Sequence, residues 1–349
     1  MLILTKDKVN KVKLSKTIFA LVLFLLVFLP ACGGGETGGP EVEEPIKITV
    51  QLMPYFSFAP LYIAEEEGYF AEQGLEVEFV RFFTDEALVG LVNGDIDVAV
   101  LMVSTGMFNI IAQEGGIMVV ADKGYVAPEG CTVNGIIARK DLVDSGELDD
   151  VSRLAGKVIA IKPLTIEGFF MDKVLEGSGV ALEDLDDVEM GSPVTEMEAF
   201  GTGALDLSAT GEPWITRINL GGNTVTWRDY KDLIPDAQYA VFIFGPSFLE
   251  ENPEAGRRFI VAYLKAVEQY NQGKTERNME LLQAFTELEP ELLDQICWPT
   301  FRIDGAINAE SMIEFQEWAV EKGYLDEVLS VDEFWDPSFI EYANQVLGE

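Results

Sequence analysis

The sequence predicts an α/β protein made of two lobes with similar topology. From Ile46 onward, short apolar runs typical of strands alternate with stretches of helical periodicity. The order of these elements between Lys47 and Asp97 recurs between Lys157 and Asp206, at nearly the same spacing. A chain of 349 residues is also long enough for two domains of ordinary size.

The first lobe is expected to begin with a strand that leads into an aromatic loop. The expected elements are, in order, a strand at 46–52, a helix at 61–73, a strand at 75–80, a helix at 85–92, a strand at 96–102, a helix at 104–113 and a strand at 117–121. Gly74 and Gly94 follow the first two helices, and glycine commonly terminates a helix.

The second lobe repeats this order. Its expected elements are a strand at 157–161, a helix at 167–176, a strand at 188–190, a helix at 195–200 and a strand at 205–209. The segment Gly203–Ser208 echoes Gly94–Ala99, so that in each lobe a glycine ends a helix and the next strand is entered through an aspartate. A strand at 239–244 and helices at 253–270, 276–286 and 309–322 follow.

This repeat implies that the chain builds the first lobe, crosses to the second and then returns. We expect the two crossings near residues 123–133 and 228–238, and we expect them to act as a hinge. The first lobe then comprises residues 46–125 and 238–349, and the second comprises residues 126–237.

The N-terminus is expected to be a targeting segment. Five lysines precede the uncharged apolar run Ile18–Leu29, which is too short to span about 30 Å of hydrocarbon as a helix. The segment Leu29–Cys32 resembles a bacterial lipobox, in which the cysteine is lipidated and becomes the mature N-terminus. We therefore expect a signal peptide at 1–31, lipidation at Cys32, a flexible tether at 32–45 and an extracytoplasmic, membrane-anchored protein.

Composition excludes several classes of function. With 24 basic and 60 acidic residues the formal charge is -36, so nucleic acid is not an expected partner. The chain has no histidine, which excludes serine–histidine triads, cysteine–histidine pairs and histidine-ligated zinc. Cys32, Cys131 and Cys297 are too far apart for a CxxC motif, and whether the last two form a disulfide stays open.

Two short motifs resemble nucleotide-binding loops but lack required residues. The segment Gly273–Thr275 would need a glycine where Glu268 stands, and a helix rather than a strand precedes it. The segment Gly201–Gly203 has Asp206 at the position of the third glycine. We therefore expect no catalytic residues, no cofactor, no metal and no enzymatic activity.

Several segments together carry a family resemblance. They are Ala59–Ala64, Gly68–Phe70, Gly74–Val77, Gly94–Ala99, Leu154–Lys157 and Glu212–Trp214. The sequence resembles solute-binding proteins of ABC importers, in the branch that binds nitrate, alkanesulfonates, taurine and thiamine-pyrimidine precursors. The resemblance covers about residues 46–348 and implies a type II periplasmic-binding-protein fold, with the ligand held in a cleft between the lobes.

The candidate ligand contacts lie where strands end. In open α/β sheets, ligands bind beyond the carboxyl ends of the strands. The side chains at these positions are aromatic, hydroxylic or acidic, as is usual for a small-molecule site. The ligand-binding candidates are Tyr55, Phe56, Phe58, Thr84, Ser104, Thr105, Thr165, Glu167, Glu212 and Trp214.

Each candidate also has a structural explanation. The aromatic side chains near Phe56 can pack in the core, Ser104 can cap the following helix, and Glu167 suits a helix N-terminus. Glu212 beside the indole of Trp214 suits a cationic or N–H-bearing ring through hydrogen bonding and cation–π contact. Glu212 can equally be a solvated loop residue.

The sequence thus favours a substrate-binding lipoprotein that captures a small organic solute and, as the resemblance implies, delivers it to a membrane permease. Because only Arg81 and Lys162 lie near the strand ends, a nitrogen heterocycle such as a vitamin or pyrimidine precursor is preferred. The alternatives are a nitrate-, alkanesulfonate- or taurine-type anion binder and a pyrimidine-synthesis-like enzyme on the same fold. The protein is expected to be a monomer, with permease and ATPase subunits as separate chains.

Overall fold

The computed structural model describes residues 44–348, apart from residues 54, 83, 114 and 132. The expected signal peptide, Cys32 and most of the expected tether lie outside the described residues. In the described part of the chain, no helix combines the length and the apolar character that crossing a membrane requires.

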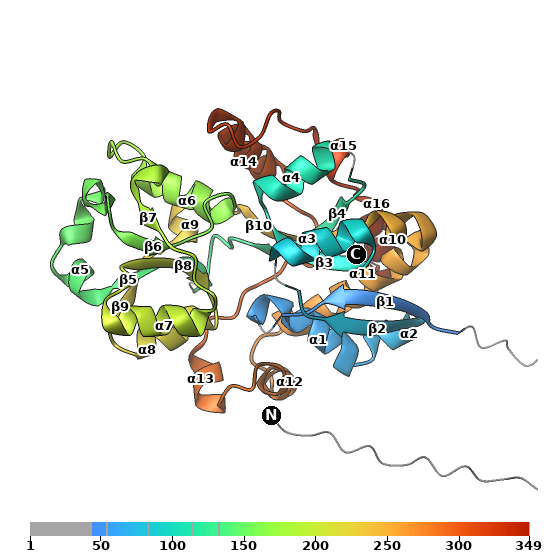
Figure 1. Ribbon diagram of the computed structural model, residues 1–349. Helices are drawn as coiled ribbons and strands as arrows, with labels where there is room; N and C mark the ends of the chain where they lie inside the picture. Colours follow the sequence, from blue (N-terminus) through green and yellow to red (C-terminus); the bar gives the residue numbers. More distant parts are fainter. Residues whose placement is uncertain (1–43, 54, 83, 114, 132, 349) are drawn as a thin grey trace, which may run out of the picture. The chain divides into compact units, whose positions relative to one another are not determined.

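The first sheet is mixed and has the strand order β2-β1-β3-β10-β4 (Figure 1). Its strands are β1 (Ile46–Gln51), β2 (Leu75–Val80), β3 (Val98–Met102), β4 (Met118–Tyr125) and β10 (Gln238–Phe244). Strand β1 pairs parallel with β2 and β3, whereas β10 pairs antiparallel with both β3 and β4. Strand β4 therefore runs in the same direction as β1 and β3.

The second sheet has the same mixed character and the order β7-β6-β8-β5-β9. Its strands are β5 (Asn134–Arg139), β6 (Val158–Ala160), β7 (Asp186–Asp187), β8 (Leu207–Gly211) and β9 (Thr224–Asp229). Strand β6 pairs parallel with β7 and β8, and β5 pairs antiparallel with β8 and β9. The chain passes from the first sheet to the second after β4 and returns after β9.

Helices flank both sheets (Figure 1). They are α1 (Ala59–Glu66), α2 (Tyr69–Glu72), α3 (Thr84–Asn93), α4 (Thr105–Ala112), α5 (Lys140–Asp144), α6 (Ile166–Leu175), α7 (Pro193–Thr202), α8 (Trp214–Leu220), α9 (Tyr230–Leu233), α10 (Pro246–Glu251), α11 (Pro253–Asn271), α12 (Glu276–Thr286), α13 (Pro290–Gln295), α14 (Ala309–Glu321), α15 (Val331–Phe334) and α16 (Ser338–Leu347). The expected helix at 61–73 is interrupted, because Gly68 adopts a left-handed conformation with φ of 76° between α1 and α2.

The repeated glycine–aspartate segment has the same structure in both sheets. Gly94 and Gly203 have φ values of 77° and 74°. Asp97 accepts a hydrogen bond from the backbone N–H of Thr49 at 2.7 Å, and Asp206 accepts one from Val158 at 3.0 Å. Each aspartate thus ties the entry of a strand to the neighbouring parallel strand, which confirms the repeat that the sequence predicts.

One hydrophobic core extends across both sheets through α6 and α14. Phe169 on α6 packs edge-on against Phe315, with ring centroids 6.1 Å apart, and lies 5.5 Å from the ring centroid of Trp318. Asp172 at the same contact accepts hydrogen bonds from Trp318 Nε1 at 3.0 Å and Lys322 Nζ at 2.7 Å. Helix α14 therefore attaches the C-terminal part of the chain to the helix that follows β6.

Candidate site where the two sheets meet

The carboxyl-end loops of the two sheets contact each other directly. The N–H of Thr105 donates to the carbonyl of Leu164 at 3.0 Å, and the N–H of Ile166 donates to the carbonyl of Val103 at 2.8 Å. The N–H of Val103 donates to the carbonyl of Tyr239 at the start of β10, at 3.0 Å. We give the name interlobe site to a set of polar side chains at these two sheet edges. It comprises an interacting group, Tyr55, Lys162, Glu167, Glu196 and Tyr239, and the pair Ser57 and Lys123 beside the loop that follows β1.

Glu167 is a buried carboxylate with partners from both sheets. Its side chain is in the first turn of α6, and the residue is 6% exposed. The hydroxyl of Tyr239 donates to Oε1 at 2.9 Å, and the N–H of Lys162 donates to Oε2 at 3.2 Å. Burial raises the pKa of Glu167, and these partners together with the charge of Lys162 partly oppose the shift.

Glu196 faces Glu167 and was not among the residues that the sequence predicted. It lies in the first turn of α7, and Ser208 Oγ donates to its carboxylate at 2.9 Å. Burial raises the pKa of Glu196 to about 7, and the charge of Glu167 contributes to the increase. The sequence could have indicated Glu196, because it lies at the start of the helix that follows β7, and ligand contacts are expected after the ends of strands.

Tyr55 completes this acidic group from the first sheet. Burial raises the pKa of its phenol, and the charges of Glu196 and Glu167 raise it further. The predicted candidates Tyr55 and Glu167 are therefore brought together. Lys162, which is exposed, is the cation whose charge acts on both carboxylates.

Lys123 is a second residue that the sequence reasoning missed. It is 2% exposed, donates to Ser57 Oγ at 2.7 Å and lies 3.6 Å from the ring centroid of Phe58. Burial lowers the pKa of its amine well below the ordinary value. The sequence could have indicated Lys123, because the otherwise apolar run 117–126 contains two adjacent charged residues, Asp122 and Lys123.

The remaining aromatic candidates lie in the core. Phe56 is fully buried, with its ring centroid 5.9 Å from that of Trp298, and Phe58 lies beneath Lys123. Core packing therefore accounts for Phe56, whereas Phe58 borders the interlobe site. Thr84 begins α3, and the structure does not describe its side chain.

The hydroxylic candidates hold the two sheets together. Ser104 caps α4 by accepting from the N–H of Met107 at 3.3 Å, and it forms an isolated β-bridge with Thr165. Thr105 Oγ1 donates to the carbonyl of Leu164 at 3.3 Å, and Thr165 Oγ1 donates to that of Lys162 at 2.8 Å. Their side-chain hydrogen bonds are thus engaged within the protein.

Glu212 lines a cavity whose lining does not include Glu167. Its carboxylate accepts hydrogen bonds from the N–H of Thr216 at 3.1 Å, its hydroxyl at 2.7 Å and the N–H of Cys297 at 3.4 Å. It lines an open cavity of about 630 Å³ beside a disulfide between Cys131 and Cys297, and the Glu212–Pro213 peptide bond is cis. Burial raises the pKa of Glu212.

Trp214 does not line this cavity. The Arg217 guanidinium lies 4.5 Å from its ring centroid, and Trp227 is covered in the same way by Arg228 at 4.1 Å. Glu212 and Trp214, which the sequence placed together around a ligand, therefore have separate surroundings.

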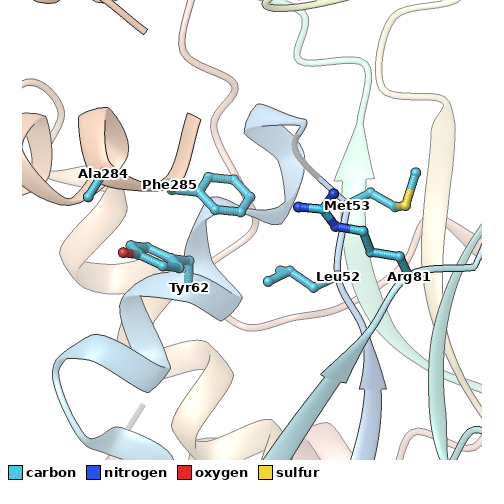
Figure 2. Close-up of a pocket in the computed structure, with 6 residues that line it drawn as sticks. All are labelled: Leu52, Met53, Tyr62, Arg81, Ala284 and Phe285. Atoms are coloured by element: carbon cyan, nitrogen blue, oxygen red, sulfur yellow. The ribbon is translucent and has the colours of Figure 1, made fainter. Parts of the chain in front are cut away.

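A smaller cavity of about 190 Å³ lies beyond the ends of β1 and β2 (Figure 2). Tyr62 and Phe285 stack on one side with ring centroids 5.0 Å apart, and the Arg81 guanidinium projects toward them. Within the described part of the chain, Arg81 has no ion-pair partner. The described residues also include no group of three or more cysteine, aspartate or glutamate side chains placed to hold a metal ion.

Two mixed five-stranded sheets, with their carboxyl-end loops in contact, match the type II periplasmic-binding-protein fold. The chain belongs to the NMT1/THI5 like family, whose sequence pattern matches residues 55–273. It is 20% identical over 312 residues to the putative binding protein YtlA of Bacillus subtilis (strain 168). The matched region covers 87% of this chain and 88% of that protein.

Solved structures share this fold at low identity. The periplasmic nitrate-binding protein NrtA from Synechocystis PCC 6803 has a TM-score of 0.71 at 18% identity, covering 87% of this chain and 89% of that one. The alkanesulfonate-binding protein SsuA from Xanthomonas axonopodis pv. citri, bound to MOPS, has a TM-score of 0.65 at 17% identity, covering 84% and 98%. The desulfurization enzyme DszB also has the fold, with a TM-score of 0.59 at 13% identity, covering 86% and 99%.

Proposed function

We propose that this protein captures a nitrogen heterocycle in the interlobe site and delivers it to an ABC permease. The observation that carries the proposal is the group formed by Glu167 and Glu196 from the second sheet and Tyr55 from the first. Buried carboxylates accept N–H groups strongly, and a tyrosine ring offers a flat face to a planar ligand. Membership of a solute-binding family supports the transport role.

An anion binder is the second candidate. Lys162 and Arg81 supply positive charge near the strand ends, and Lys123 supplies N–H donors. The solved structures with this fold include a nitrate-binding and an alkanesulfonate-binding protein. Glu167 and Glu196 disfavour a bare anion beside them, because an anion there would meet two carboxylates. An enzyme is the third candidate, since DszB shares the fold.

Mass spectrometry of compounds released by denaturing the purified protein tests all three candidates. A nitrogen heterocycle bound again without chemical change supports the proposal. Nitrate or a sulfonate supports the anion binder, and a compound consumed on incubation with fresh protein supports an enzyme. The replacement Glu196→Gln should weaken heterocycle binding by about ten- to a hundredfold, as expected for the loss of a hydrogen bond to a charged group. Calorimetry measures this change in affinity. Unchanged affinity would remove Glu196 from the site.

We also propose that the protein works outside the cytoplasmic membrane as a lipoprotein anchored at Cys32. The basic, apolar and lipobox-like succession at 1–32 supports the anchor, and the named periplasmic proteins of the same fold support the compartment. Replacement Cys32→Ser should move the protein from the membrane to the soluble extracytoplasmic fraction on immunoblots of separated fractions. A Cys32→Ser protein that still sediments with membranes would contradict the anchor, and wild type run in parallel is the control.

A further inference from the structure

Lys123 lies at the edge of the first sheet that contains the interlobe site. Strand β4 runs in the same direction as β1, and Lys123 is two residues before the end of β4. Tyr239, which donates to Glu167, is near the start of the antiparallel neighbour β10 and therefore lies at the same edge. Ser57, the hydrogen-bond partner of Lys123, is two residues after Tyr55 in the loop that follows β1.

The amine of Lys123 has too few partners for its burial. Even an uncharged amine has two N–H donors, and among the described residues Ser57 Oγ is the hydrogen-bond acceptor that the structure gives it. No carboxylate of a described residue lies within ion-pair distance. The neighbouring Asp122 is engaged elsewhere, by Gln238 Nε2 at 2.7 Å and the N–H of Arg302 at 3.3 Å. A buried N–H donor without an acceptor is costly, so a further acceptor is expected.

We propose that Lys123 selects the solute by donating to an anionic or strongly accepting oxygen group of the ligand, whose N–H groups face Glu167 and Glu196. This inference rests on the proposed binding function and narrows it. The ligand class is then a small ring compound with amino or ring N–H groups on one side and a carboxylate or carbonyl oxygen on the other. A bare anion would provide no N–H donor for the two carboxylates, and a plain amine would provide no oxygen acceptor for Lys123.

Two probes that differ in one group test this assignment: 2-aminopyrimidine and 2-aminopyrimidine-5-carboxylate. By calorimetry, wild type should bind the carboxylate probe about ten- to a hundredfold more tightly than the parent ring, the range expected for a hydrogen bond to a charged group. Lys123→Met should bind both probes with the same affinity. A preference that survives in Lys123→Met overturns the inference, and so does wild type that binds neither probe at millimolar concentration.

Further variants separate recognition from a structural role. Lys123→Met should be at least as stable to heat as wild type, since it removes a buried amine that has an unmatched N–H donor and keeps an unbranched chain of similar length. Wild type alone keeps the test valid if Lys123→Met does not fold, because wild type that binds both probes with the same affinity contradicts the inference.

The exposed lysine Lys47, which pairs with Glu76 at 3.1 Å, provides the matched control Lys47→Met. This variant should match wild type in both probe affinity and melting temperature. Release of a small molecule from denatured wild type would uphold the binding function even where the Lys123 inference fails.

Discussion

Glu196 is a carboxyl group whose protonation changes near neutral pH. Its pKa in the folded protein is about 7, above the ordinary value of 4.5, because the side chain is partly buried and Glu167 is near. The folded chain therefore binds this proton more readily than the unfolded chain. Binding of this proton stabilises the folded protein relative to the unfolded chain. This contribution to stability is fully present below about pH 4.5 and is lost as the pH rises through about 7.

Replacement Glu196→Gln should accordingly change stability in a pH-dependent way. At pH 8 the variant should melt at a higher temperature than wild type, because glutamine avoids the cost of a buried negative charge beside Glu167. At pH 4.5 the two proteins should differ little. Thermal unfolding followed by circular dichroism at both pH values measures this, and an equal difference at the two pH values would contradict the assigned titration. The exposed residue Glu198 on the same helix supplies the control Glu198→Gln.

The residues of the interlobe site were predictable to different degrees. Tyr55 and Glu167 lie in the segments that follow β1 and β6, and the rule that ligands gather at the carboxyl ends of strands selects them. Lys123 lies inside a strand, so its position depends on the register between β4 and β10, which a single sequence does not reveal. Glu212 satisfies the same rule as Glu167, yet its carboxylate caps the helix beside it through Thr216.

At the scale of single elements, α6 depends on one close backbone contact. A Cβ atom on Gly168 would lie 2.0 Å from the carbonyl oxygen of Pro163. Only glycine therefore fits at position 168, in the first turn of this helix, without a shift of the backbone. Because the neighbouring Glu167 belongs to the interlobe site, any displacement of α6 also moves a predicted ligand contact.

Gly168→Ala should therefore destabilise the protein by about 1–3 kcal/mol, the usual cost of overpacking, and should also weaken ligand binding. Chemical denaturation and calorimetry with the released compound measure the two effects. Gly201→Ala is the matched control, because a Cβ atom at this exposed position of α7 contacts nothing within 4 Å. The control should leave binding unchanged and raise stability by up to about 1 kcal/mol. A fully stable Gly168→Ala variant would show that the Pro163 loop moves freely.

The disulfide joins two further elements. Cys131 lies just before β5, and Cys297 follows α13. Their Cα atoms are 5.7 Å apart, and their sequence separation is 166. The paired replacement of both cysteines by serine should lower the free energy of unfolding by about 2–4 kcal/mol, since the link restricts a long loop in the unfolded chain. Urea unfolding measures the change. Reductant should lower the free energy of unfolding of wild type toward that of the variant and should leave the variant unchanged. A wild type whose unfolding does not respond to reductant would contradict the disulfide.

Most strands and helices followed from periodicity, and the exceptions have physical causes. Strands β5 and β9, which the sequence analysis did not predict, pair antiparallel within the second sheet and fall in or next to the segments that were assigned to crossings. Strand β7 is two residues long, and its position at Asp186–Asp187, rather than 188–190, depends on pairing with β6 and not on any apolar pattern.

At the scale of the whole molecule, ligand binding is expected to change the separation of the lobes. A ligand that contacts both sheets favours the closed form only by binding it more tightly than the open form. Opening has to break the backbone hydrogen bonds from Thr105 to Leu164 and from Ile166 to Val103, so we expect two distinct states. Small-angle scattering should give a smaller radius of gyration with the released compound than without it. Identical curves at saturating compound would contradict closure.

The disulfide has a consequence for how the chain can be oxidised. Three cysteines allow three different single pairings, two of them wrong. If Cys32 carries lipid through its sulfur, as proposed, that thiol is withdrawn and only Cys131 and Cys297 can react with each other. Lipidation would then act as a protecting group for the correct connectivity. Oxidative refolding of protein that carries a free thiol at position 32 should yield scrambled species, visible as non-native disulfide peptides, that the lipidated form lacks.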